Sequence, residues 1–254
     1  MPLFTTEALV LRTYKLGEVD RIVVFLTRDR GKKRGVAPGA RRLRSRFGAA
    51  LEPLTRVGLT YYEREGRELV SMNYAEPMSS PMWASRSDAL GHAGYFAELI
   101  DEWSQESDPS ETMFRLGCSV VDAMVAGMAI EPLARYVEYW ILRLQGVYPS
   151  LSTCGLCGGR LSRPGGPPAV LMPGERDYRC AACARPATRA VALSDEALAF
   201  LKAIGGLAPT RLDEVAVTDN VLRQLEAAHC ALIVTHLEKE LKSTRVLRDL
   251  RERD

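Results

Sequence analysis

Histidines and long apolar runs are scarce in this 254-residue chain, and its net charge is small. It contains only three histidines, and they suggest no nucleophile–base constellation, which makes a hydrolase an unattractive interpretation. The longest uncharged, apolar-leaning run, residues 124–130, is far too short to cross a bilayer. Residues 1–7 lack the basic-then-apolar pattern of a secretion signal, so we expect a cytoplasmic protein without membrane contact.

The net charge of +2 conceals an uneven distribution of charged residues. Residues 1–72 hold 15 basic and 8 acidic residues, whereas residues 73–150 hold 4 basic and 11 acidic residues. The positive charge is concentrated further in residues 28–46, which contain nine Lys or Arg and a single acid, Asp29. A basic head joined to an acidic middle suggests two surfaces with different partners.

The first 78 residues predict a small β domain. Five short runs rich in β-branched and apolar residues are bounded by turn signals, and the turn at residues 64–67 is typical of a hairpin. Five strands in fewer than 80 residues favour a closed barrel, for which the OB-fold is the commonest solution, with an SH3-like barrel as the main rival. The candidate strands are residues 6–14, 21–27, 32–37, 54–63 and 68–76.

The middle and the end of the chain carry helical periodicity, with apolar residues three and four positions apart. Asp108 followed by Pro109 predicts one helix start, and Ser194 and Thr218 predict two more, the last helix reaching about residue 248. The whole pattern predicts an α+β multi-domain protein. Its predicted domains are an OB-fold barrel at 1–78, a helical domain at 79–150 and 190–254, and a cysteine-containing insertion at 151–189.

Four of the six cysteines form two Cys-x2-Cys pairs, Cys154 with Cys157 and Cys180 with Cys183, separated by 22 residues. Each pair turns two thiolates toward one point, and four sulfurs suit a tetrahedral structural Zn²⁺ in a ribbon-like motif. The polar, Gly/Pro-rich segment between the pairs needs such a staple to become ordered. Two disulfides are the alternative, which a cytoplasmic location disfavours.

The basic segment predicts contact with nucleic acid. Positive side chains spread along a groove bind phosphates without a fixed catalytic geometry, and aromatic rings add stacking platforms for single strands. A solvated charged face is the alternative. No side chains are visibly arranged to read base edges, so we expect little sequence preference. The candidate DNA-binding residues are Lys32, Lys33, Arg34, Arg41, Arg42, Arg44 and Arg46, with Tyr61 as an aromatic contact.

Several motifs of the chain resemble the RecO family, the bacterial recombination mediators of DNA repair. The helical middle, the double Cys-x2-Cys and residues 236–243 follow the family in order and spacing, so that the resemblance covers essentially the whole chain. The N-terminal motifs are its most specific part. They read EALVLR at 7–12, GEVDRIV at 17–23, GARR at 39–42 and LEPL at 51–54.

The resemblance implies a role without catalysis. RecO proteins have an N-terminal OB-fold, a helical domain and often a zinc motif. They bind single- and double-stranded DNA, anneal complementary strands, and with RecR help a RecA-type recombinase replace the single-stranded-DNA-binding protein SSB. The resemblance also implies a helical-domain site for the acidic tail of SSB and association with the nucleoid during repair. Candidates for the SSB contact are Arg135, Arg143, Lys239 and Lys242.

Two other classes of function fit parts of the sequence. An RNA- or ribosome-associated module with an OB-fold and a zinc ribbon has the same composition, and only the motif match favours DNA repair. A thiol-dependent enzyme would need a reactive Cys near a His, and Cys230 beside His229 points in a different direction on a helix. Zinc binding by His229 and His236 is a further option, although a packed helix face explains them more simply.

Overall fold

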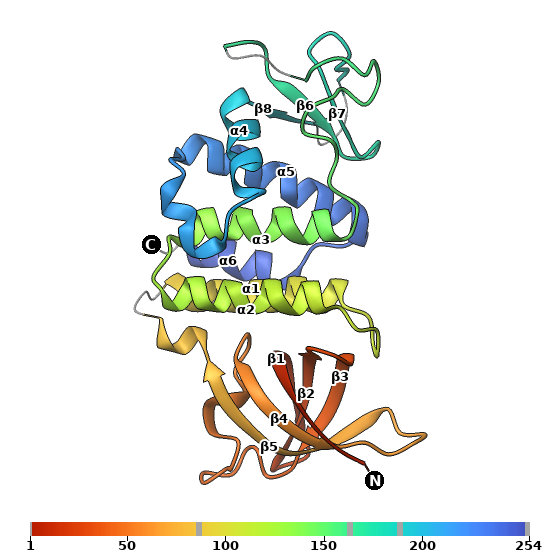
Figure 1. Cartoon of the computed structure of the whole chain (residues 1–254), viewed down its shortest axis with the longest axis vertical. Helices are drawn as coiled ribbons and strands as arrows, with labels where there is room; N and C mark the ends of the chain where they lie inside the picture. The colour runs from red at the N-terminus through yellow and green to blue at the C-terminus, as the bar shows by residue number, and fades with distance from the viewer. Residues whose placement is uncertain (1, 85–87, 162–164, 187–189, 252–254) are drawn as a thin grey trace. The chain divides into compact units, whose positions relative to one another are not determined.

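A computed structural model describes residues 2–84, 88–161, 165–186 and 190–251 of the chain (Figure 1). The chain divides into two compact units, Met1–Ile130 with Ser243–Asp254, and Glu131–Lys242. Among the described residues, no helix has the length and apolar character needed to span a membrane.

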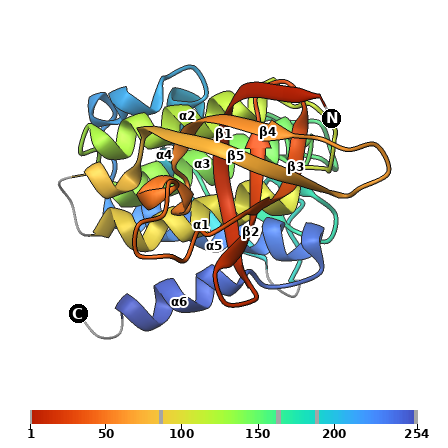
Figure 2. The same cartoon turned by 90° about the horizontal axis from the view of Figure 1, so that it is seen from below.

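The first unit contains a closed five-stranded barrel with the strand order β1-β2-β3-β5-β4, which Figure 2 shows from below. Strand β4 pairs with β1 to close the barrel, and β3 and β5 are its parallel pair. This arrangement confirms the predicted OB-fold, and the strand predictions are confirmed to within a few residues at each end. The strands are β1 (Leu3–Leu16), β2 (Asp20–Thr27), β3 (Gly31–Ala37), β4 (Arg56–Tyr62) and β5 (Leu69–Ser79).

Strands β1 and β2 are apolar on both faces because both faces are buried. Val10 and Phe25 point into the barrel core, whereas Leu9 and Leu26 are fully buried on the outer face. On that outer face, α1 (Asp88–Trp103) and α2 (Glu111–Val125) cover β1. The contact is close, since a Cβ added at Gly117 of α2 would lie 2.5 Å from the Leu9 side chain.

Helix α2 begins at Glu111, so the predicted cap at Asp108 is wrong. The segment before the helix runs beside β3 instead, where the Ser107 N–H donates to the Lys32 carbonyl at 2.9 Å. This pairing is confined to residues 105–107, where Ser107 takes a left-handed conformation with φ 58°. The unit also contains the short helices η1 (Gly48–Leu51) and η2 (Pro81–Trp83), and α6 (Lys242–Arg251) starts at its boundary.

The second unit combines helices with a three-stranded sheet of order β7-β6-β8. Ser194 and Thr218 accept hydrogen bonds from the N–H groups three residues on, which confirms both predicted caps. The single helix predicted to reach about residue 248 is wrong, because Glu238 takes a left-handed conformation with φ 56° and ends α5. The elements are α3 (Ile130–Leu144), β6 (Ala169–Met172), β7 (Asp177–Arg179), β8 (Val191–Leu193), α4 (Asp195–Ile204), η3 (Pro209–Glu214) and α5 (Asp219–Leu237).

Candidate nucleic-acid interface and metal centre

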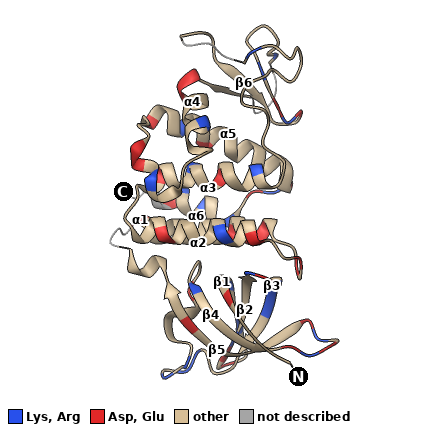
Figure 3. Ribbon diagram, in the orientation of Figure 1, with Lys and Arg blue, Asp and Glu red and all other residues tan. Residues whose placement is uncertain are grey.

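The loop between β3 and β4 presents four arginines, Arg41, Arg42, Arg44 and Arg46, and all four are exposed. We call residues 38–47 the arginine loop. Figure 3 shows it on the side of the barrel away from α1 and α2. Its two ends are fixed by different contacts. The N–H of Gly39 donates to Asp20 Oδ1 at 2.7 Å, and the Phe47 ring is buried in the barrel core.

The positive charge of this loop is not cancelled by carboxylates. Arg41 Nη1 donates to two neutral acceptors, the carbonyls of Gly17 at 3.0 Å and Glu18 at 2.8 Å. The Arg46 guanidinium lies 5.1 Å from the centroid of the Phe47 ring. Within the part of the chain that the structure describes, no ion pair involves the four loop arginines. A cationic loop of this kind suits a phosphate chain.

The basic residues of β3 have carboxylate partners instead. Lys32 Nζ lies 3.0 Å from Asp101 Oδ1, and Lys33 Nζ lies 2.8 Å from Glu63 Oε1. Arg34 is bound by Glu106, whose hydrogen bonds raise the pKa of this guanidinium. The predicted DNA contacts of these three residues stay predictions. Only Arg34, with half of its side chain exposed, offers a phosphate ready access.

The carboxylates that meet β3 and β1 come largely from the acidic middle of the chain. Asp101 at the end of α1 also lies 3.1 Å from Arg12 Nη2 of β1. Glu106 belongs to the segment that runs beside β3. The sequence suggested a separate acidic surface, but these acids fix α1 and the following segment against the barrel. Sequence reasoning missed Asp101 and Glu106, because pairs so far apart in the chain leave no local pattern.

Tyr61 is not a stacking platform, and this prediction is wrong. Its side chain is fully buried in the barrel, with ring centroids 5.6 Å from Phe4 and 6.0 Å from Phe25. Burial raises the pKa of Tyr61 to about 12. The alternation of β4 contained the signal for this, since Val57 and Leu59 share the inward face with Tyr61.

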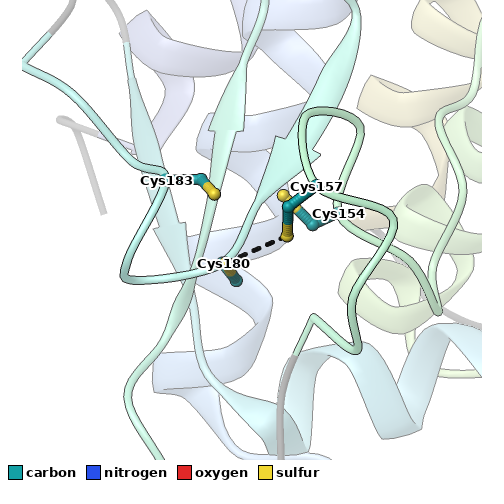
Figure 4. A group of neighbouring side chains, drawn as sticks. All are labelled: Cys154, Cys157, Cys180 and Cys183. Carbon is teal, nitrogen blue, oxygen red and sulfur yellow. Dashed lines mark hydrogen bonds between the residues drawn. The ribbon is translucent and has the colours of Figure 1, made fainter.

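The four cysteines of the two Cys-x2-Cys pairs come together, and their sulfurs all lie within 4.8 Å of one another (Figure 4). The sulfurs of Cys157 and Cys180 are 3.9 Å apart. Zn–S bonds of about 2.3 Å in a tetrahedron require sulfur separations of about 3.8 Å, so the cluster fits a zinc ion. All four are free thiols, and no disulfide joins them.

Backbone hydrogen bonds shape the first knuckle of this cluster. The Cys154 N–H donates to the Gly159 carbonyl at 2.8 Å, and the Gly158 N–H donates back to the Cys154 carbonyl at 2.9 Å. Gly158 has a φ of +68°, which favours glycine. Gly155 lies against β7, where its N–H donates to the Tyr178 carbonyl at 2.9 Å and an added Cβ would collide with Asp177. The knuckle is therefore seated on the sheet.

The thiols of the cluster differ in pKa. Burial raises the pKa of Cys154, but N–H donors at Cys157, Cys180 and Leu156 outweigh it and lower that pKa to about 6. The Cys183 S–H donates to the sulfurs of Cys180 and Cys157, which stabilises the neutral thiol and raises the pKa of Cys183 to about 12. One thiolate therefore forms near neutral pH, and a bound metal must displace the remaining protons.

The predicted SSB contacts differ in their exposure. Arg135 is 3% exposed and pairs with Glu138 at 2.9 Å, so its prediction as a surface contact is wrong. Arg143, Lys239 and Lys242 are exposed, and their role stays a prediction. His229 is fully buried with hydrogen bonds at both ring nitrogens, which excludes it as a zinc ligand and agrees with a packed helix face.

Two family models and several known proteins match this chain. A family model described as Recombination protein O N terminal matches residues 1–81, and one described as Recombination protein O C terminal matches residues 84–245. A DNA repair protein RecO of Anaeromyxobacter sp. (strain K) is 34% identical over 245 residues, 95% of this chain and 94% of that protein. One of Geobacter metallireducens is 33% identical over 251 residues, covering 96% and 97%. One of Koribacter versatilis is 42% identical over 160 residues, covering 61% and 64%.

Proposed function

The chain belongs to the recombination protein O family and acts in DNA repair, and from this premise we propose that it binds single- and double-stranded DNA and anneals complementary strands. The observation that carries the proposal is the arginine loop. Its four exposed cations have no carboxylate partner within the described residues and lie together at one edge of an OB-fold barrel.

Annealing by this surface needs electrostatics rather than bond-making chemistry. Two phosphate chains repel each other, and a cationic loop that contacts both lowers this repulsion while base pairs form. Contacts to phosphates do not distinguish bases, so binding has little sequence preference. No acid, base or nucleophile takes part, and the protein acts as a mediator rather than an enzyme.

The family premise extends the proposal to protein partners. With RecR, the chain would load a RecA-type recombinase onto single strands coated with SSB, at the nucleoid of the cell. The acidic tail of SSB requires cations, for which Arg143, Lys239 and Lys242 of the second unit are exposed. The Nη1 of Arg143 donates to the Tyr139 hydroxyl at 2.7 Å.

The cysteine cluster would hold a structural zinc ion. Four thiolates complete its tetrahedron and leave no position for a substrate. Bound zinc would supply cross-links between the knuckle at residues 154–159 and the strand end at Cys180, and so order a Gly/Pro-rich segment that has few apolar residues of its own. The metal therefore supports the fold of the second unit and takes no part in DNA chemistry.

Strand annealing tests the proposal directly. Complementary oligonucleotides coated with SSB should anneal faster when the full chain is added, and RecR should alter that rate. A competition between single-stranded DNA, duplex DNA and RNA of equal length should show retention of both DNA forms. Absence of annealing together with a preference for RNA would contradict the proposal and favour an RNA-associated module.

A further inference from the structure

A series of hydrogen-bonded polar side chains, buried except for the half-buried Tyr148, crosses the second unit and has no part in the proposed DNA contacts. Glu138 of α3 accepts from Arg135 at 2.9 Å, and its other oxygen lies 2.8 Å from His229 Nδ1 of α5. His229 Nε2 lies 2.9 Å from the Tyr148 hydroxyl, which lies 3.3 Å from the Tyr178 hydroxyl of β7. Side chains from two helices, a loop and a strand are thus joined.

The hydrogen bonds that link Tyr178 to Glu138 all run in the same direction. Burial lowers the pKa of His229 despite the opposing effect of Glu138, so the ring is neutral and carries one proton. The Glu138 carboxylate accepts from Nδ1–H, which leaves Nε2 as an acceptor for the Tyr148 O–H. The Tyr148 oxygen then accepts from Tyr178. Every hydrogen bond is oriented toward Glu138, and bonds aligned in this way strengthen one another.

Tyr178, at the end of this hydrogen-bonded series, contacts the metal centre. Tyr178 is 1% exposed, and its carbonyl accepts the N–H of Gly155, the residue after the first cysteine of the first knuckle. Cys180 follows Tyr178 by two residues in the same strand end. The Tyr178 backbone therefore contacts the first knuckle directly and leads into a ligand of the second pair, while its side chain ends the series of polar contacts.

We propose that Tyr148 and Tyr178 are positioning residues for the metal centre, held by His229 and Glu138, so that metal binding and the packing of α3 against α5 stabilise each other. The inference rests on the zinc site of the proposed function. Hydrogen bonds outside the ligand shell orient ligands and tune metal affinity. Here the bond that reaches the knuckle is the one from the Gly155 N–H to the Tyr178 carbonyl. Because coupling is reciprocal, a change that weakens metal binding must also reduce the stability that the metal confers.

The matched pair Tyr148→Phe and Tyr136→Phe tests this coupling in the full chain. Each variant removes one hydroxyl from a tyrosine of the second unit, but the Tyr136 hydroxyl donates to the Leu207 carbonyl at 3.0 Å and lies outside the chain of bonds. Zinc affinity is measured by competition with a chromogenic chelator. We expect Tyr148→Phe to lower the affinity at least threefold and Tyr136→Phe to change it less than twofold.

Thermal unfolding supplies a second readout that needs no activity. Zinc removal should lower the Tm of Tyr148→Phe by less than it lowers the Tm of the unmodified chain. If Tyr148→Phe fails to fold, Tyr178→Phe replaces it, because this variant leaves the bond between Tyr148 and His229 intact. Zinc removal should again lower its Tm by less than it lowers the Tm of the unmodified chain. Equal zinc affinity for the Tyr148 or Tyr178 variant and the Tyr136 variant would overturn the inference. An unmodified chain that binds no zinc would overturn the metal site itself.

Discussion

Replacing Arg42 and Arg44 together by alanine should weaken single-stranded DNA binding and flatten its dependence on salt. Both side chains are exposed. Arg41 is unsuitable because it fixes the loop to the β1–β2 turn, and Arg46 because it stacks on Phe47. The double variant therefore removes two charges with the loop anchors intact, and its free energy of unfolding should stay unchanged.

The size of the effect follows from the number of loop cations. Each phosphate contact on a single strand adds about 0.7 to the slope of log affinity against log salt, so four contacts give a slope of about −2.8. Between 50 and 200 mM salt, the contribution of the loop then falls about 50-fold, against about sevenfold for the two arginines left in the variant. Fluorescence anisotropy with a labelled oligonucleotide over a salt series measures both slopes.

A control variant with the same change in net charge separates local contact from overall charge. Lys202 and Arg211 are exposed cations of the second unit, and their replacement by alanine should leave the slope as it is in the unmodified chain. If the Arg42/Arg44 variant keeps the full slope, or if the control flattens it equally, the arginine loop is not the phosphate-binding surface.

Three further predictions test contacts within the two units. Glu106→Gln should release Arg34 and raise single-stranded DNA affinity by less than about fivefold at low salt, as expected for a surface ion pair; unchanged anisotropy would show that Arg34 does not reach DNA. Because burial lowers the pKa of His229 while Glu138 opposes this shift, the unfolded state takes up a proton first, so stability is complete above about pH 6.5 and falls below it. Urea unfolding at pH 7.5 and 5.5 should show that dependence, and His229→Gln should reduce it. Gly31→Ala places a Cβ 2.5 Å from the Asp108 backbone at φ +69° and should destabilise more than Gly17→Ala, which has φ +57° and open space; equal urea midpoints would contradict this.

Local sequence patterns were sufficient to predict most of the helices and strands. Alternating and continuous apolar runs with Gly-containing turns predicted all five barrel strands, and the caps at Ser194 and Thr218 predicted two helix starts. The spacing of the cysteines predicted which sulfurs meet. These features depend on residues close together in the sequence, or on a coordination chemistry with fixed requirements.

Features that depend on distant contacts were not predictable. Glu238 ends α5 in a left-handed conformation without the Gly or Pro that usually marks such a break. Asp108 does not cap α2, because the segment before the helix pairs with β3. Arg135 is buried with its Nη1 3.8 Å from Glu226, a residue of α5 that lies far away in the sequence.

The cover of α1 and α2 over the outer face of β1 also limits how the barrel could hold a polynucleotide. Leu9 and Leu26 are used for packing within the first unit, so this face offers no flat bed on which nucleobases could lie. In the proposed function, a DNA strand at the arginine loop would be bound through its sugar–phosphate backbone. Its Watson–Crick edges would then remain free to pair with a complementary strand.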